Sequence, residues 1–334
     1  MRKPDHNPYR ISVVIPAYNI KAYLSRAIDS VLDQTLPPDE IIVVDDGSTD
    51  ETAAVAQQYG SQIRYIHQEN AGLSAARNTG IRAATCRWIA LLDGDDEWLK
   101  DKLQLQVDML KRNPHLVWAC SNCYIHRVQC NQRAMMHPSD SLDSHLAGRD
   151  TFDDYLIAAN WGAEGHPDTM IIERQALLEA GLFREGLPFY EDHDMWWRIA
   201  YRWPQFGYLS QPLAIYYVDR PGSLTCDTSR ARQIEVLREL INRHWSLALR
   251  AGRLAPYKIR LDMFLQGIMK KLLQENENPL VLYILNRYGS LFGVRTRIEM
   301  RLRAIFPGSM LPFFNFYHQI KQKIFFRVRG AINR

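Results

Sequence analysis

The feature that most constrains the fold is a regular alternation of two patterns over the first ninety-odd residues. Short β-branched runs, typical of buried strands, alternate with segments whose apolar residues recur at helical spacing. The strand-like runs are Ile11–Ile15, Ile41–Val44, Ile63–Ile66 and Trp88–Leu92. Strands joined by helices in this order are connected by right-handed crossovers and pair as a parallel sheet. The pattern therefore predicts an α/β fold whose ligands bind beyond the carboxyl ends of the strands.

Three of these runs end in residues suited to binding a ligand. The first leads into Pro16-Ala17-Tyr18-Asn19, the second into Asp45-Asp46, and the fourth into Asp93-Gly94-Asp95-Asp96. Carboxylates so close together raise one another's pKa unless a cation lies among them. Their hard oxygens suit magnesium or manganese, ions that keep open positions for phosphate oxygens. On the acidic motif alone, a solvated turn with Gly94 supplying the bend explains the sequence equally well.

The segment before the third expected helix, Ser74 to Ala84, is a candidate anion site. The chain has no Gly-Lys-Ser/Thr phosphate loop and no glycine-rich dinucleotide turn after the first strand. Instead Asn70-Ala-Gly72 leads into the helix, whose amino terminus offers N–H groups and partial positive charge to an anion. An ordinary capped helix explains this segment better when it is taken alone. Arg77 shifts the balance, because about one turn into the helix its guanidinium can reach a phosphate or a carboxylate.

These segments carry a family resemblance. The matching motifs are Ser12-Val-Val-Ile-Pro-Ala-Tyr-Asn19, Val44-Asp-Asp-Gly-Ser-Thr-Asp50, Asn70-Ala-Gly-Leu-Ser-Ala-Ala-Arg-Asn78 and Leu92-Asp-Gly-Asp-Asp96. In order and spacing they resemble the family 2 inverting glycosyltransferases of the bacterial cell-surface polysaccharide type. The resemblance covers roughly residues 10–224. It implies the GT-A nucleotide-diphospho-sugar transferase fold, with a Rossmann-like mixed sheet, and a hexosyltransferase-like enzyme.

The resemblance also implies a donor site. Pro16, Ala17 and Tyr18 would cradle the nucleobase, and Asp46 would bond the base or the ribose. Asp95 would hold the divalent cation, Mg²⁺ or Mn²⁺, that bridges the diphosphate of the donor. The full set of residues implied to bind the donor is Pro16, Ala17, Tyr18, Asn19, Asp46, Asn70, Gly72, Arg77, Asp93 and Arg220.

A Glu-Asp pair near residue 190 is the candidate catalytic centre. Apolar residues from Trp196 onward recur at helical spacing, which puts Glu191 and Asp192 at the amino terminus of a helix. Acidic side chains cap that end of a helix well, so capping alone explains an isolated pair. In the family the aspartate of this pair is the catalytic base. The resemblance therefore implies that role for Asp192, with Glu191 beside it, and the two interpretations are compatible.

The last match to the family is weaker. Many members place an arginine and a histidine in a closing segment that Tyr216–Leu224 resembles, and here Val218 and Arg220 stand at those positions. Because that histidine sometimes helps to bind the metal, a protein ligand beyond Asp95 is in doubt. Arg220 could instead neutralise the leaving diphosphate.

Charge divides the chain into two parts. Residues 1–240 contain 24 Lys and Arg against 33 Asp and Glu, a net charge of −9, whereas residues 241–334 carry +13. We expect a catalytic domain over residues 1–225, with a nucleotide-sugar half at about 10–96 and an acceptor half at about 97–225. A basic helical extension is expected over residues 226–334.

The extension favours a membrane partner. Between residues 294 and 329, two apolar stripes at helical spacing are interleaved with Lys and Arg, as in helices that bind an anionic membrane surface. Packing on the catalytic body or on a second chain is the alternative. Nucleic acid is not expected, because no nucleic-acid-binding motif accompanies the charge.

Compartment and redox state follow from what the sequence contains. No secretory signal opens the chain, and no run of about 20 apolar residues is present. A zinc site at Cys120, Cys123, Cys130 and His126 is disfavoured, because positions three apart on a strand face opposite ways. The expected location is cytoplasmic with reduced cysteines, peripheral on the inner face of the cell membrane.

The expected reaction is inverting transfer of a sugar from a nucleotide diphosphate, with UDP favoured, to a hydroxyl of a glycan or lipid-linked glycan. Two alternatives stay open. A nucleotidyltransferase shares the nucleotide-binding architecture but attacks phosphorus, and the Glu191-Asp192 helix argues against it. A non-catalytic nucleotide-sugar binder or membrane scaffold is supported only by the altered segment at residues 218–220.

Overall fold

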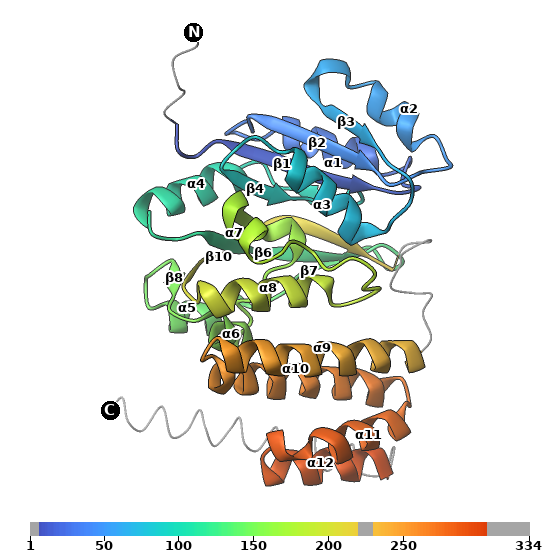
Figure 1. Cartoon of the computed structure of the whole chain (residues 1–334), viewed down its shortest axis with the longest axis vertical. Helices are drawn as coiled ribbons and strands as arrows, with labels where there is room; N and C mark the ends of the chain where they lie inside the picture. The colour runs from blue at the N-terminus through green and yellow to red at the C-terminus, as the bar shows by residue number, and fades with distance from the viewer. Residues whose placement is uncertain (1–6, 220–229, 306–334) are drawn as a thin grey trace. The chain divides into compact units, whose positions relative to one another are not determined.

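The computed structural model describes residues 7–219 and 230–305 (Figure 1). The chain divides into two compact units, Met1–Pro256 and Tyr257–Arg334. The first unit is built on one mixed sheet in the order β3-β2-β1-β4-β9-β6-β10-β5, with β7 paired to β6 and β8 to β10. The strands are β1 Ile11–Ala17, β2 Glu40–Asp45, β3 Arg64–His67, β4 Trp88–Leu91, β5 Glu97–Trp98, β6 Trp118–Arg127, β7 Gln132–Met135, β8 Thr151–Phe152, β9 Ile171–Glu173 and β10 Phe206–Val218.

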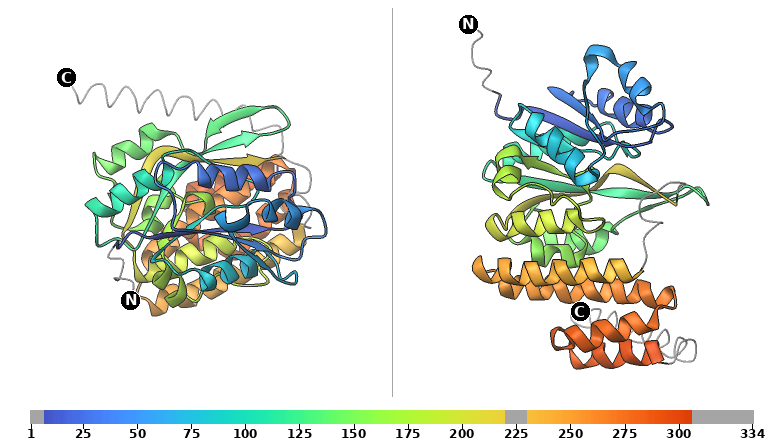
Figure 2. Two further views of the ribbon diagram at one scale, coloured as in Figure 1. Left: turned by 90° about the horizontal axis from the view of Figure 1, so that it is seen from above. Right: turned by 45° about the vertical axis from the view of Figure 1, so that its right-hand side comes forward.

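Helices cover both faces of the sheet. In the first unit they are α1 Leu24–Leu32, α2 Thr52–Gln57, α3 Leu73–Ala83, α4 Lys102–Arg112, α5 Ser139–Leu146, α6 Tyr155–Ala158, α7 Arg174–Glu179, α8 Glu191–Arg202 and α9 Arg230–Arg250. Figure 2 shows α1 (blue) and α3 (cyan) on opposite faces of the first strands. Alternation along β1 explains this, because successive side chains of a strand point to opposite faces.

The four strands β3, β2, β1 and β4 pair in parallel, as the sequence predicts. Val13 and Ile15 of β1 join a buried core with Leu24 and Ile28 of α1. On the other face, a Cβ atom at Gly80 of α3 would lie only 2.3 Å from a methyl carbon of Val14, so only glycine lets α3 approach β1 so closely. The close-packed layers align the carboxyl ends of β1, β2 and β4 along one edge.

Strand β9 joins this parallel half to the rest of the sheet. It runs antiparallel both to β4 and to β6, which makes the sheet mixed. Residues 129–150 contain the short strand β7 and the helix α5. All four residues of β7 are exposed, so the segment lacks the apolar alternation by which a strand is recognised.

The second unit consists of helices in its described part. Helix α10 (Leu254–Gln274) enters it, and α11 (Asn278–Tyr288) and α12 (Val294–Ile305) follow. The expected boundary at residue 225 precedes this division, because α9 belongs to the first unit, where His244 Nε2 lies 3.1 Å from Asp194 Oδ1 of α8. No helix within residues 7–219 and 230–305 is both long and apolar enough to cross a membrane.

Candidate active site

The turns that follow β1 and β2 are tied together at the sheet edge. The side-chain oxygen of Asn19 accepts hydrogen bonds from Thr49 N at 2.7 Å and Asp50 N at 3.3 Å, and Asn19 N donates to Ser48 Oγ. Tyr18 is 44% exposed beside this bridge. Pro16 and Ala17 are buried in β1, so only their backbone can face a nucleobase. Of the four residues predicted here, Tyr18 and Asn19 are presented to solvent.

Asp46 holds the loop that precedes α3. Its Oδ1 accepts hydrogen bonds from Gln68 Nε2 at 2.6 Å and Ala71 N at 3.0 Å, and its Oδ2 accepts from Gly72 N at 2.8 Å. The carboxylate is almost fully buried. These bonds orient the exposed backbone from Asn70 to Gly72. The structure thus gives Asp46 a local task that the sequence did not predict, and its contact with a base or ribose stays a prediction.

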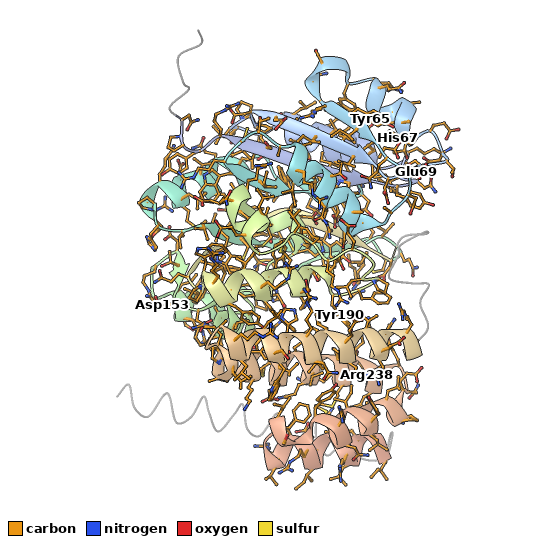
Figure 3. The ribbon with its side chains drawn as sticks, in the orientation of Figure 1. Tyr65, His67, Glu69, Asp153, Tyr190 and Arg238 are labelled. Carbon is orange, nitrogen blue, oxygen red and sulfur yellow. The ribbon has the colours of Figure 1, made fainter. Side chains whose placement is uncertain are left out.

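Asp45 does not bind this loop but makes a separate set of hydrogen bonds. Tyr65 Oη donates to its Oδ2 at 2.6 Å, and Ser48 N donates to its Oδ1 at 2.9 Å. Tyr65 and His67, both labelled in Figure 3, come from β3, and His67 Nδ1 lies 3.6 Å from the same carboxylate. Burial would raise the pKa of Asp45, but these hydrogen bonds outweigh it and hold the pKa below its ordinary value.

Arg77 links the acidic turn after β4 to the start of α8. Its guanidinium donates to Asp93 Oδ1, after β4, at 2.6 Å and to Glu191 Oε1, at the start of α8, at 3.0 Å. Arg77 is only 1% exposed, and the carboxylates of Asp93 and Glu191 are also mostly buried. Burial and the neighbouring Asp192 raise the pKa of Glu191, although Arg77 opposes the shift. The sequence left open whether Arg77 binds a phosphate or a carboxylate. In the structure it binds two carboxylates.

Asp192 is the second residue of α8, which begins directly after Tyr190, the residue that Figure 3 labels. Its Oδ1 lies 2.7 Å from Nδ1 of His193, whose Nε2 lies 3.0 Å from Glu164 Oε1. Burial would lower the pKa of His193, but Asp192 and Glu164 raise it to about 10. Burial likewise would raise the pKa of Asp192, but His193 holds it well below its usual range. Asp192 is therefore ionised at neutral pH, the state that a general base requires.

The acidic turn after β4 depends on glycine. A Cβ atom at Gly94 would lie 2.7 Å from the carbonyl oxygen of Pro16, so a larger residue would collide with the end of β1. Asp95 is partly exposed, and Arg26 donates to its carbonyl oxygen. Asp96 is 1% exposed and accepts a hydrogen bond from Tyr217 N at 2.8 Å. The role of Asp95 as metal ligand stays a prediction, and the structure adds Arg26 as its neighbour.

Sequence reasoning missed a second buried group next to the turn. Asp168 Oδ1 accepts a hydrogen bond from Asp93 N at 2.7 Å, and Nδ1 of His166 lies 2.8 Å from Asp168 Oδ2. Burial and the nearby Asp168 raise the pKa of Asp96 well above its usual range. Burial lowers the pKa of Lys102 to about 7, although Asp168 opposes the shift. Only the antiparallel pairing of β9 with β4 brings these residues to the acidic turn, and the sequence carries no signal for that pairing.

One predicted donor residue, Arg220, lies outside the described residues. Strand β10 ends just before it at Val218, and Asp219 accepts a hydrogen bond from Arg127 at 3.0 Å. The remaining candidates come from five chain segments. A hydrogen bond joins Gly72 to Asp46, and Arg77 joins Asp93 to Glu191.

Comparison with known proteins gives one matching family model, described as Glycosyl transferase family 2, over residues 12–179. An uncharacterised glycosyltransferase of Rickettsia prowazekii is 32% identical over 204 residues, which cover 59% of this chain and 60% of that protein. TuaG of Bacillus subtilis, a putative teichuronic acid biosynthesis glycosyltransferase, is 43% identical over 104 residues, 30% of this chain and 41% of that protein. The chain thus matches about 60% or less of the length of these relatives.

A solved structure shares the fold. It is the crystal structure of residues 1–349 of S. aureus TarS in complex with UDP-GlcNAc. The TM-score is 0.57 at 18% sequence identity, and the match covers 88% of this chain and 90% of that chain. The mixed α/β sheet followed by a helical carboxyl-terminal region is therefore the GT-A architecture that the sequence predicts.

Proposed function

The chain belongs to glycosyl transferase family 2, and on that premise we propose that it transfers a sugar from a nucleotide diphosphate to a hydroxyl group with inversion. One observation carries this proposal. Arg77 joins Asp93, on the donor side of the crevice, to Glu191, which directly precedes the candidate base Asp192. A donor bound at the strand ends would therefore lie next to a carboxylate that is ionised and partly accessible.

In the proposed reaction, Asp192 accepts the proton of the acceptor hydroxyl as its oxygen attacks the anomeric carbon. A bond forms between that oxygen and the carbon on the face opposite the leaving diphosphate, which departs with the electron pair of the broken bond. Attack from the opposite face inverts the anomeric centre. His193 lies against Asp192 on one side and Glu164 on the other, and so holds the base in its ionised form.

The donor is proposed to be a UDP-sugar, with Mg²⁺ or Mn²⁺ at Asp95. The shared fold with a TarS structure that contains UDP-GlcNAc supports the choice of nucleotide. A bound cation would supply positive charge for the departing diphosphate. Tyr18, Asn19 and the loop oriented by Asp46 are the proposed contacts of the nucleotide.

The acceptor is proposed to be a glycan or lipid-linked glycan in cell-surface polysaccharide synthesis. Similarity to a putative teichuronic acid biosynthesis enzyme supports this class. Assays with a panel of nucleotide sugars test it against the alternatives. A glycosyltransferase releases a nucleoside diphosphate, a nucleotidyltransferase forms or consumes pyrophosphate, and a binding protein shifts the melting temperature without turnover.

We predict that metal-dependent binding of UDP requires the carboxylate of Asp95. Asp95→Ala should abolish the part of UDP affinity that depends on manganese, because a hard oxygen ligand of the cation is lost. Calorimetric titration of UDP with and without Mn²⁺ measures this. Asp33→Ala, which removes an exposed carboxylate at the end of α1, is the control and should change nothing. Unchanged metal-dependent affinity in Asp95→Ala would exclude Asp95 as the ligand.

The second unit is proposed to hold the enzyme on an anionic membrane. Along α12, Val294, Ile298 and Ile305 are all more than half exposed among arginines, which is the expected appearance of a helix that binds lipid. Residues 306–329, the rest of the predicted membrane-binding segment, lie outside the described residues. Packing against a second chain is the competing proposal.

We predict that replacing the arginines of α12 releases the protein from anionic vesicles. The variant carries Gln at the four positions Arg295, Arg297, Arg301 and Arg303. Each basic residue near such a surface contributes about 1 kcal/mol, so losing four should weaken binding strongly while donor hydrolysis stays intact. Sedimentation with anionic and neutral vesicles measures the effect. Equal binding of the wild type to both kinds of vesicle, or to neither, would remove electrostatic anchoring.

A further inference from the structure

A cavity in the second unit combines arginines with apolar side chains. It is formed by α11, α12 and the turn between them, and its volume is about 500 Å³. Figure 1 shows the two helices side by side. The volume falls within the range of about 300–1,000 Å³ that sites for small molecules have. Three arginines and three apolar residues line it: Arg287, Arg297, Arg301, Leu285, Val294 and Ile298. Among the described residues, none that lines the cavity is acidic.

The sequence of α12 places both kinds of side chain on one face of the helix. Residues three and four positions apart are neighbours on a helix surface. Val294, Arg297, Ile298 and Arg301 follow this spacing, so α12 presents two charged and two apolar side chains to the cavity. Like charges four positions apart disfavour a helix, and an anion bound near them would remove this repulsion. This face of α12 therefore suits a ligand that is both anionic and apolar.

The three arginines of the cavity lack carboxylate partners. Within residues 7–219 and 230–305, none of Arg287, Arg297 and Arg301 forms an ion pair. Arg301 instead donates to the side-chain oxygen of Asn286 at 2.7 Å, which orients its guanidinium. Val294 is the first residue of α12, so the partial positive charge of the helix amino terminus adds to that of the arginines. The described residues thus leave the positive charge of the cavity without a counter-charge.

The sequence around the cavity contains almost no acidic residue. From residue 278 to residue 305, Glu299 is the one acidic residue, and its carboxylate pairs with Arg303 at 2.8 Å. Residues 306–334 contain five Lys and Arg but no Asp or Glu. A segment of this composition cannot neutralise the arginines. An anionic ligand of the cavity must therefore come from outside this part of the chain.

We propose that the cavity binds the phosphate group of a lipid. Guanidinium groups form paired, charge-assisted hydrogen bonds with phosphate oxygens, which is the role of the arginines. The first carbons of the lipid chain contact Val294 and Ile298, which are 62% and 55% exposed, so the lipid removes apolar surface from water. Free phosphate satisfies only the arginines. The site makes the proposed membrane attachment of the second unit specific for a head group, and it rests on that attachment but not on sugar transfer.

The first test uses the full-length protein and dihexanoyl phosphatidic acid, a lipid phosphate whose short chains keep it soluble. Calorimetric titration should show binding to the wild type and at least about tenfold weaker binding to the double variant Arg297→Gln with Arg301→Gln, because charge-assisted hydrogen bonds are lost. Inorganic phosphate should also bind the wild type at least about tenfold more weakly than the lipid, because it buries no apolar surface. Circular dichroism checks that the variant is folded.

The matched control is the double variant Lys270→Gln with Lys271→Gln. It removes the same number of charges from exposed positions of α10, outside the cavity, and should keep the affinity of the wild type for the lipid. Equal affinity of the wild type and the folded arginine variant would overturn the proposal. Inorganic phosphate that binds as tightly as the lipid would overturn the assignment to a lipid.

Vesicles separate this site from general electrostatic attachment. Sedimentation compares phosphatidylcholine vesicles that contain phosphatidic acid with vesicles that contain phosphatidylserine, matched in zeta potential. The wild type and the lysine variant should prefer phosphatidic acid, and the arginine variant should lose this preference. Equal binding of the wild type to both kinds of vesicle would contradict the site while membrane attachment stands, and binding to neither would overturn both. Release of UDP from the donor is measured separately, so a failed lipid site and a failed sugar transfer give different results.

Discussion

Asp192→Asn should lower turnover by about 10²–10⁴-fold, the usual contribution of a general base, while the affinity for the donor stays near that of the wild type. The amide keeps the size of the side chain and an oxygen that can accept the hydrogen bond from His193 N, so the fold should survive. It cannot accept the proton of the acceptor hydroxyl. Steady-state kinetics together with calorimetric titration of the UDP-sugar separate the two effects.

The matched control for this prediction is Asp153→Asn. Asp153 is an exposed aspartate whose side chain lies 3.8 Å from Arg149, and its loss should leave turnover unchanged. If Asp192→Asn retained near-normal turnover, another group would have to be the base. If it lost donor affinity as well as turnover, Asp192 would serve binding and not proton transfer.

Arg77→Met should lower the free energy of unfolding by about 3–5 kcal/mol, the typical cost of removing one partner of a buried ion pair. The side chain of Met fills most of the same space, but it leaves Asp93 and Glu191 without their shared cation. Turnover should fall as well, because the acidic turn and the start of α8 are then no longer held together. Urea denaturation measures the free energy.

Two further variants sharpen this test. Arg82→Met changes an exposed arginine on the same helix, 4.0 Å from Glu185, and should cost at most about 0.5 kcal/mol. Adding Glu191→Gln to Arg77→Met removes one of the two orphaned charges and should restore part of the lost stability. A cost within about 1 kcal/mol for Arg77→Met would mean that the buried ion pairs of Arg77 are not what joins the donor half to α8.

The sequence predicted the parallel half of the sheet and the position of the acidic turn, because both rest on local patterns. Apolar runs that end in carboxylates predict where strand ends lie, and β1, β2 and β4 follow this rule. It also placed Glu191 and Asp192 correctly at the start of α8. Each of these features is determined within about a dozen neighbouring residues.

What the sequence left undecided depends on contacts between distant segments. The partner of Arg77 was open between phosphate and carboxylate, and Glu191 stands 114 positions further along the chain. Nothing local in the sequence specified that β9 would pair antiparallel with β4 and so bring Asp168 to Asp93. The hydrogen bonds from the loop before α3 to the oxygens of Asp46 are likewise contacts between distant segments, and the sequence did not predict them.

The central claim is that this crevice catalyses inverting transfer from a nucleotide diphosphate sugar. Proton nuclear magnetic resonance can follow the first product formed from an α-linked UDP-sugar with Mn²⁺, with a hydroxyl acceptor or with water in its place. We predict release of UDP together with a sugar in the β configuration. Formation of the α product, or of a sugar phosphate with uridine monophosphate, would contradict the account.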